Sequence, residues 1–253
     1  MIDLLDVVND QIDRNIYHGA SIALFKGGKW SESYVGTIDG DNPVQPGMIY
    51  DLASVSKVVG VGTVVISLVR EGKLDIDMPL KHYYPEFHEN KLTLRQLLTH
   101  SSGINPFIPN RDSLNAEQLK DAINHITVED KKDFLYTDIN FLLLGFMLEK
   151  IFDKSLQAIF QEEVFNPFAM SDTSFGPVKN AVPTVAGISD GVVHDPKAKV
   201  LGCHSGSAGL FSTVSDLEKM CQHYLNDDFA RDLWQNYSRA NKERSLAWNK
   251  EGD

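Results

Sequence analysis

The pattern of apolar positions at the start of the chain predicts a helix followed by a β-hairpin. Two runs rich in β-branched and aromatic residues, 20–26 and 29–36, flank Gly27 and Gly28, which is a hairpin signal. The segment 3–16 precedes them and predicts an amphipathic helix, with apolar residues at Leu4, Leu5, Val7, Val8, Ile12 and Ile16.

The middle of the chain reads as helix and loop. Helices are expected over 54–70, 92–100, 115–125, 138–152 and 155–164. Asp138 suits the N-cap of the fourth helix, and Ser212 or Thr213 suits the N-cap of a final amphipathic helix. The stretch 171–210 is rich in Gly, Pro, Ser and Asp and has little periodicity. Because a hairpin alone is marginally stable, further strands are expected late in the chain.

Composition limits the class of protein. The 253 residues suffice for one large domain or two small lobes around a cleft, and 42% hydrophobic with 23% charged residues is a globular mix. A net charge of -11 argues against a nucleic-acid partner. The longest apolar run, 58–69, falls short of the ~20 residues of a membrane helix, so no membrane partner is expected.

The N-terminus and the cysteines indicate a cytoplasmic location. The first residues lack the basic and apolar regions of a secretory signal. The only cysteines, Cys203 and Cys221, are expected to be free thiols in a reducing compartment. His194 and His204 do not have the spacing of a zinc site, so no metal and no cofactor are expected.

A Ser-x-x-Lys sequence stands where a loop enters an apolar helix. Ser54 and Lys57 are three residues apart, so their side chains share one helix face. A serine hydroxyl becomes a strong nucleophile only when a base takes its proton, and a lysine in a dry setting can be that base. Taken alone, the pattern fits equally well a capping serine with a solvated lysine.

Three segments together resemble one enzyme family. Residues 51–58 (DLASVSKV), 97–104 (LLTHSSGI) and 208–213 (AGLFST) are similar, in this order, to segments of the penicillin-recognising serine hydrolases. This group comprises class C β-lactamases, DD-peptidases and related esterases. The resemblance extends from about residue 19 to residue 248.

The resemblance implies an α/β (α+β) fold of the β-lactamase type, in which helices flank an antiparallel sheet and form a helical lobe. The chain is expected to be a single domain over 1–253. Residues 1–56 and about 190–253 would form an α/β lobe, and about 57–189 a mainly helical lobe.

The resemblance also assigns site residues. Ser54 falls on the family's nucleophile and Lys57 on its lysine, and Tyr136 falls on the tyrosine of a Tyr-x-Asn motif, where a phenol can relay protons. Asp138 falls where the family has asparagine. An ionised carboxylate cannot donate to a substrate carbonyl, so Asp138 either binds substrate differently or pairs with Lys57 and caps its helix. His100 is expected to be structural.

The family's third motif is Lys-Thr-Gly or His-Thr-Gly on a strand that supplies part of the oxyanion hole. Neither sequence occurs in this chain. The motif normally follows a segment like 245–249, so the C-terminal strands are expected to be absent. Either the sequence is a fragment of a longer protein, or something else completes the sheet.

The expected function is that of a serine hydrolase that forms an acyl-enzyme on an ester or amide, such as a β-lactam, a D-alanyl peptide or a simple ester. Its expected partner is a small-molecule or peptide-like substrate. Two alternatives remain at this point: a ligand-binding protein without turnover, and an inactive fragment that lacks the third motif.

Overall fold

The computed structural model describes residues 4–185, 187–188, 190–226 and 228–250. Its strands are β1 (Gly19–Lys26), β2 (Lys29–Gly36), β3 (Tyr50–Asp51), β4 (Ser174–Phe175) and β5 (Leu210–Ser212). Its α-helices are α1 (Leu4–Asp13), α2 (Thr63–Arg70), α3 (Leu80–Tyr83), α4 (Leu94–Leu98), α5 (Ala116–Asn124), α6 (Ile139–Phe152), α7 (Leu156–Phe160), α8 (Pro196–Leu201), α9 (Val214–Asn226) and α10 (Phe229–Leu233).

Shorter helical turns join these elements. Three are 3₁₀ turns: η1 (Ala53–Val55), η3 (Arg111–Ser113) and η5 (Gly202–His204). Two are π-helical: η2 (Val58–Gly62) and η4 (Gln161–Phe165). The helix expected over 54–70 is therefore η1, η2 and α2 in succession. Its π-helical part follows Lys57 directly, and such turns are frequent at functional sites.

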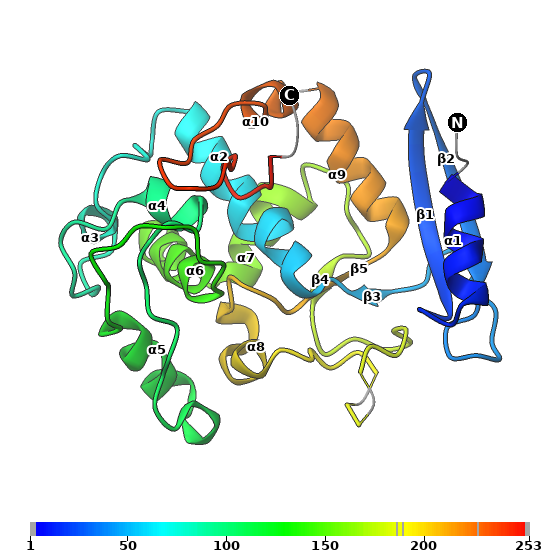
Figure 1. The fold of residues 1–253 in the computed structure, drawn as a ribbon, viewed down its shortest axis with the longest axis horizontal. Helices are drawn as coiled ribbons and strands as arrows, with labels where there is room; N and C mark the ends of the chain where they lie inside the picture. Colours follow the sequence, from blue (N-terminus) through cyan, green and yellow to red (C-terminus); the bar gives the residue numbers. More distant parts are fainter. Residues whose placement is uncertain (1–3, 186, 189, 227, 251–253) are drawn as a thin grey trace.

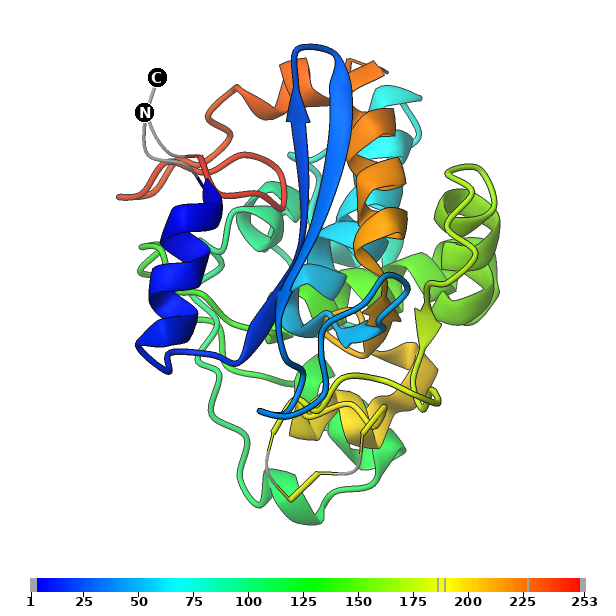
Figure 2. The same cartoon turned by 90° about the vertical axis from the view of Figure 1, so that its right-hand side faces the viewer.

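The hairpin is confirmed, with β1 and β2 antiparallel from the Gly19–Gly36 pair to the Lys26–Lys29 pair. A second antiparallel sheet has the order β3-β5-β4. Figures 1 and 2 show the hairpin and α1 at one end of the molecule, with the hairpin between α1 and α9. A polar contact joins the hairpin to α9, since Trp30 Nε1 donates to Gln222 Oε1 at 2.7 Å.

The expectation of further strands late in the chain is met only by β5. Among the described residues no named strand follows it, and Arg244 and Asn249 form a single isolated antiparallel bridge. The division into two lobes stays a prediction. One strand, β4, nevertheless comes from the part that was expected to be mainly helical.

The core lies between α2, α6 and the helices around them (Figure 1). In α6 the ten consecutive residues 139–148 are all buried, as expected for a helix that is apolar on every side. The segment Ala53–Arg70 is 18 residues long with a mean hydropathy of 1.5, longer than the run recognised from sequence. By length and composition it could cross a membrane, but 61% of it is buried within the protein, as in a core helix.

Most helix boundaries agree with the sequence predictions, including a capped α9. Thr213 Oγ1 accepts a hydrogen bond from the Asp216 N–H at 3.2 Å, so Thr213 is the N-cap. Asp138 precedes α6 as predicted, but its side chain makes no capping hydrogen bond. That part of the prediction is wrong, because two lysines take the Asp138 carboxylate instead. Cys203 and Cys221 are both free.

Candidate active site

Ser54 lies in a tight turn at the start of the central helical segment. The preceding residue, Ala53, has a φ of 47°, which is unfavourable for a residue with a Cβ. The Asp51 carboxylate supports this turn, since its Oδ1 accepts from the Ala53 N–H at 2.8 Å. Its Oδ2 lies 2.8 Å from His194 Nδ1. The turn places Ser54 in the first helical turn, where backbone N–H groups lack helical partners.

Lys57 occupies the face that the three-residue spacing predicted. Its Nζ donates to Ser54 Oγ at 2.9 Å, to Asp138 Oδ1 at 2.7 Å and to the Ser207 main-chain oxygen at 2.9 Å. Only 3% of the Lys57 side chain is exposed. Three acceptors match the three N–H bonds of an ammonium group, so this geometry describes a charged lysine with every donor used.

Tyr136 lies beside the same lysine. Lys57 Nζ is 5.2 Å from the centre of the Tyr136 ring. The ring stacks at a tilt on His100, with 4.4 Å between ring centres, and the residue is 46% exposed. Lys57 therefore lies over the face of the Tyr136 ring as a cation–π partner, and the ring is open to solvent on the cavity side.

Asp138 is part of an ion-pair network and not a helix cap. Its Oδ2 lies 2.9 Å from Lys197 Nζ, while Oδ1 accepts from Lys57. Burial alone would raise the pKa of the Asp138 carboxyl, but the two lysines outweigh it and hold the pKa below its ordinary value. Each oxygen of the Asp138 carboxylate thus has a lysine as a partner.

His100 has the contacts of a structural residue. It is 1% exposed, and its Nδ1 lies 2.9 Å from Asn140 Nδ2. Burial, with nearby Arg244 and Lys57, lowers the pKa of His100 to about 3, so the ring is neutral at pH 7 and a weak base. Its main-chain oxygen accepts from the Leu135 N–H at 2.8 Å, which ties the Tyr136 segment to α4.

A cavity of about 280 Å³ opens over the nucleophile. Among the described residues, its lining contains two cations, Lys57 and Arg244, and no carboxylate. The far wall is held by the Ala247 N–H, which donates to the Leu98 oxygen at 3.1 Å. The lining residues are Ser54, Val55, Lys57, Val58, His100, Tyr136, Arg244, Ala247, Trp248 and Asn249.

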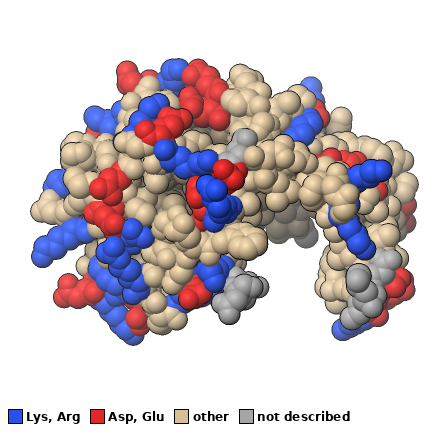
Figure 3. Space-filling model, turned by 90° about the horizontal axis from the view of Figure 1, so that it is seen from above, with Lys and Arg blue, Asp and Glu red and all other residues tan. Residues whose placement is uncertain are grey.

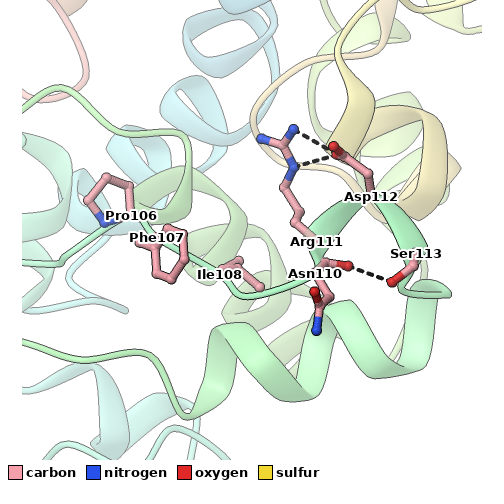
Figure 4. Close-up of a pocket in the computed structure, with 7 residues that line it drawn as sticks. All are labelled: Pro106, Phe107, Ile108, Asn110, Arg111, Asp112 and Ser113. Atoms are coloured by element: carbon pink, nitrogen blue, oxygen red, sulfur yellow. Dashed lines mark hydrogen bonds and ion pairs between the residues drawn. The ribbon is translucent and has the colours of Figure 1, made fainter.

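The charge of this cavity differs from that of the molecule as a whole. The chain carries -11, and Figure 3 shows acidic and basic side chains interspersed over one face. A larger hollow of about 610 Å³ lies along residues 106–113 (Figure 4). There Arg111 is paired with its neighbour Asp112 at 2.7 Å, and one loop supplies the described lining. Of these two cavities, the Ser54 cavity is the one that combines a candidate nucleophile with side chains from distant segments of the chain.

The chain matches one known protein family over nearly its whole length. The β-lactamase family model matches residues 6–251. The chain belongs to the β-lactamase family. Members of this family act as serine hydrolases, among them carboxypeptidases and amidases.

Curated relatives of this β-lactamase-family chain are longer than it. It is 27% identical over 240 residues to a protein of Escherichia coli (strain K12) named "Putative D-alanyl-D-alanine carboxypeptidase", covering 78% of this chain and 55% of the relative. A relative of the same name from Escherichia coli O157:H7 is 26% identical, with 87% and 62% covered. The chain thus spans little more than half the length of these relatives.

Solved structures share the fold. EstCE1, described as a hydrolase with promiscuous acyltransferase activity, has a TM-score of 0.78 at 18% identity, with 96% of this chain and 80% of that chain covered. FmtA from Staphylococcus aureus has a TM-score of 0.77 at 19% identity, covering 97% and 74%. The D-amino acid amidase from Ochrobactrum anthropi SV3 has a TM-score of 0.73 at 19% identity, covering 96% and 78%.

Two cationic residues of this site, Lys197 and Arg244, were not recognised from the sequence. Lys197 stands in α8, a helix of six residues inside a stretch without apolar periodicity. The pair Asp195-Pro196, an N-cap followed by proline at the first helical position, was the available signal. Arg244 belongs to the terminal loop, and its role in the cavity wall had no local signal.

Proposed function

We propose that the protein is a serine hydrolase that forms an acyl-enzyme on Ser54. The observation that supports this is the 2.9 Å contact between Ser54 Oγ and Lys57 Nζ in a cavity bordered by Tyr136. A hydroxyl within hydrogen-bond reach of a buried lysine is the arrangement of an activated nucleophile.

The proposed reaction has two balanced steps. With Lys57 in its neutral form, Ser54 Oγ bonds to the substrate carbonyl carbon and the bond from that carbon to the leaving oxygen or nitrogen breaks. The Ser54 proton passes by way of Lys57 and Tyr136 to the leaving atom. Water then adds to the acyl carbon, the Ser54 ester bond breaks, and the Ser54 hydroxyl regains a proton. The Ser54 N–H, in the first turn of the helical segment, would donate to the developing oxyanion.

The cavity favours a small substrate that carries no positive charge. Its volume of about 280 Å³ is at the lower end of the range for small-molecule sites. With Lys57 and Arg244 in the lining, an anionic or neutral group is favoured over an amine. Within the family's esters, amides and D-alanyl peptides, we propose a simple ester or a D-alanyl peptide whose amino group is acylated and therefore uncharged.

A second candidate function is binding without turnover. It is favoured by the saturated Lys57 ammonium group, because a lysine must lose a proton before it can accept one from Ser54. It is favoured also by Asp138 in place of the family's asparagine. Such a protein would bind an acyl compound in the cavity and release it unchanged.

The test is intact-mass spectrometry after exposure to a fluorophosphonate and, separately, to a penicillin. We expect one adduct per chain, absent in Ser54→Ala and retained in Ser67→Ala, a matched serine in α2 of the same helical segment. A folded chain that gains no adduct from either reagent, or that gains one in Ser54→Ala, contradicts the proposal. Reversible binding of the penicillin without an adduct would favour the second candidate.

A further inference from the structure

Lys197 and Asp138 form an ion pair that reaches Ser54 through Lys57. Lys197 Nζ lies 2.9 Å from Asp138 Oδ2 and 3.4 Å from Asp195 Oδ2. The Lys197 side chain is 12% exposed and that of Asp138 25% exposed. These charges continue the Lys57 contact, so cations and anions alternate along a partly buried row of Lys57, Asp138, Lys197 and Asp195.

The backbone fixes Lys197 in this row. Asp195 Oδ1 accepts from the Ala198 N–H at 2.8 Å, and Pro196 begins α8, so both residues set the start of this helix. Lys197 is therefore presented by a capped turn and not by a free loop. A buried lysine held in this way has less conformational freedom to lose when it binds a carboxylate.

Lys197 provides Asp138 with a counter-ion when Lys57 loses its proton. If Asp138 were paired with Lys57 alone, removal of the Lys57 proton would leave a buried carboxylate without a counter-ion, which is strongly unfavourable. With Lys197 on the second oxygen, the carboxylate keeps a cationic partner when Lys57 becomes neutral.

We propose that Lys197 is a positioning residue that allows Lys57 to act as a base despite Asp138, so that the Asp138–Lys197 pair together takes the place of the family's asparagine. This inference rests on the proposed serine hydrolysis and assigns one further residue to the same site. Lys197 acts through Asp138 and Lys57 and does not need to touch the substrate.

The other charged and polar groups near the row do not serve as the second counter-ion of Asp138. The polar and titratable groups that face Lys57 and Asp138 from the surrounding elements are Ser54, His100, Tyr136, Asp195, Lys197, Ser207 and Arg244. Among these, His100 is neutral at pH 7. Arg244 donates to Asn249 and to the Ala247 oxygen. Lys197 is the cation that directly contacts the second oxygen of Asp138.

The test is the pH dependence of fluorophosphonate labelling of Ser54, followed by intact mass. In Lys197→Met we expect labelling at pH 7 to be at least 10-fold slower and the rising limb of the profile to move up by about one pH unit. That change corresponds to a tenfold shift in the proton equilibrium of the base. In Lys197→Met with Asp138→Asn, the limb should return toward the wild-type position. Lys199→Met, an exposed lysine of the same helix, should leave it unchanged.

The outcomes separate the two proposals. Suppose that the wild type is labelled. If the rising limb in Lys197→Met lies at the wild-type pH, or if adding Asp138→Asn does not move the limb back, this inference is wrong and the hydrolase proposal stands. If the folded wild type is not labelled at any pH, the hydrolase proposal fails and this inference fails with it. A uniform loss of rate without movement of the limb would indicate a merely structural Lys197.

Discussion

The ammonium group of Lys57 donates a hydrogen bond of 2.9 Å to the main-chain oxygen of Ser207, a residue 150 positions later in the chain. This contact holds the lysine through a segment that packs against α6. It depends on the close approach of residue 206 to α6, where a Cβ on Gly206 would lie 2.2 Å from the Phe141 oxygen. The position of Ser207, and through it of Lys57, therefore depends on a glycine.

Gly206→Ala is expected to destabilise the protein and slow Ser54 labelling together. The added Cβ meets a main-chain oxygen, which cannot turn aside as a side chain can, so overpacking of ~1–3 kcal/mol is expected. Thermal unfolding and labelling rate measure the two effects. As a control, Ser205→Gly should keep the labelling rate within about twofold. Unchanged stability and rate in Gly206→Ala would contradict the close approach.

Lys57→Met is expected to lower the rate of Ser54 labelling by ~10²-fold or more, since general-base assistance is worth ~10²–10⁴. Stability should fall by less than the ~3–5 kcal/mol of a broken buried pair, because Asp138 keeps Lys197. Denaturant unfolding and intact-mass kinetics provide both values. Lys73→Met, at an exposed lysine, serves as the control and should alter neither.

His100 is expected to make stability fall in acid. The pKa of His100 is about 3 in the folded protein and 6.5 in its ordinary state, so below pH 6.5 the unfolded chain binds the extra proton. The stabilisation is fully present above pH 6.5 and is lost as the pH falls toward 3, by up to ~1.4 kcal/mol per pH unit.

His100→Gln should remove this component and give a flatter profile between pH 6.5 and 4.5, although the variant is less stable at pH 7. Urea unfolding at several pH values measures it. His125→Gln, at an exposed histidine, should keep the wild-type slope. A wild-type slope in His100→Gln would show that other groups cause the acid loss.

Ala53→Gly is expected to leave the protein as stable or to stabilise it slightly. Relief of the positive φ contributes ~1 kcal/mol, and the greater freedom of glycine in the unfolded chain offsets part of this. Ala122→Gly in α5 has no such strain and should cost ~1 kcal/mol. Chemical denaturation of both variants gives the contrast in sign, and an equal loss at the two positions would refute strain at Ala53.

Arg244→Gln is expected to reduce hydrolysis of a carboxylate-bearing ester ~10-fold more than that of a neutral ester of the same size. A tenfold difference corresponds to ~1.4 kcal/mol, about the free energy of one charge-assisted hydrogen bond. The measurement is kcat/KM on the two esters. Arg239→Gln, at an exposed arginine of the same segment, should not change their ratio. An equal reduction for both esters would mean that Arg244 supports the wall and does not select charge.

Local patterns predicted the elements whose signal lies within a few neighbouring residues. The hairpin ends agree to within one residue, and the spacing of Ser54 and Lys57 predicted their contact. Asp138 shows where local reasoning fails, because a capping rule considers only the first turn of α6 and cannot include lysines 81 and 59 positions away. α8 was missed because six residues hold too few turns to show a period.

The site joins segments that are far apart along the chain, since Lys57 contacts residues 81 and 150 positions away and the cavity wall comes from residues near 247. Contacts across such long loops form only after much loop-closure entropy has been lost. Modification of Ser54 would then report complete folding, and counting modified chains would measure the native fraction of any preparation or variant. A partly folded molecule that retains its helices would not react with the reagent.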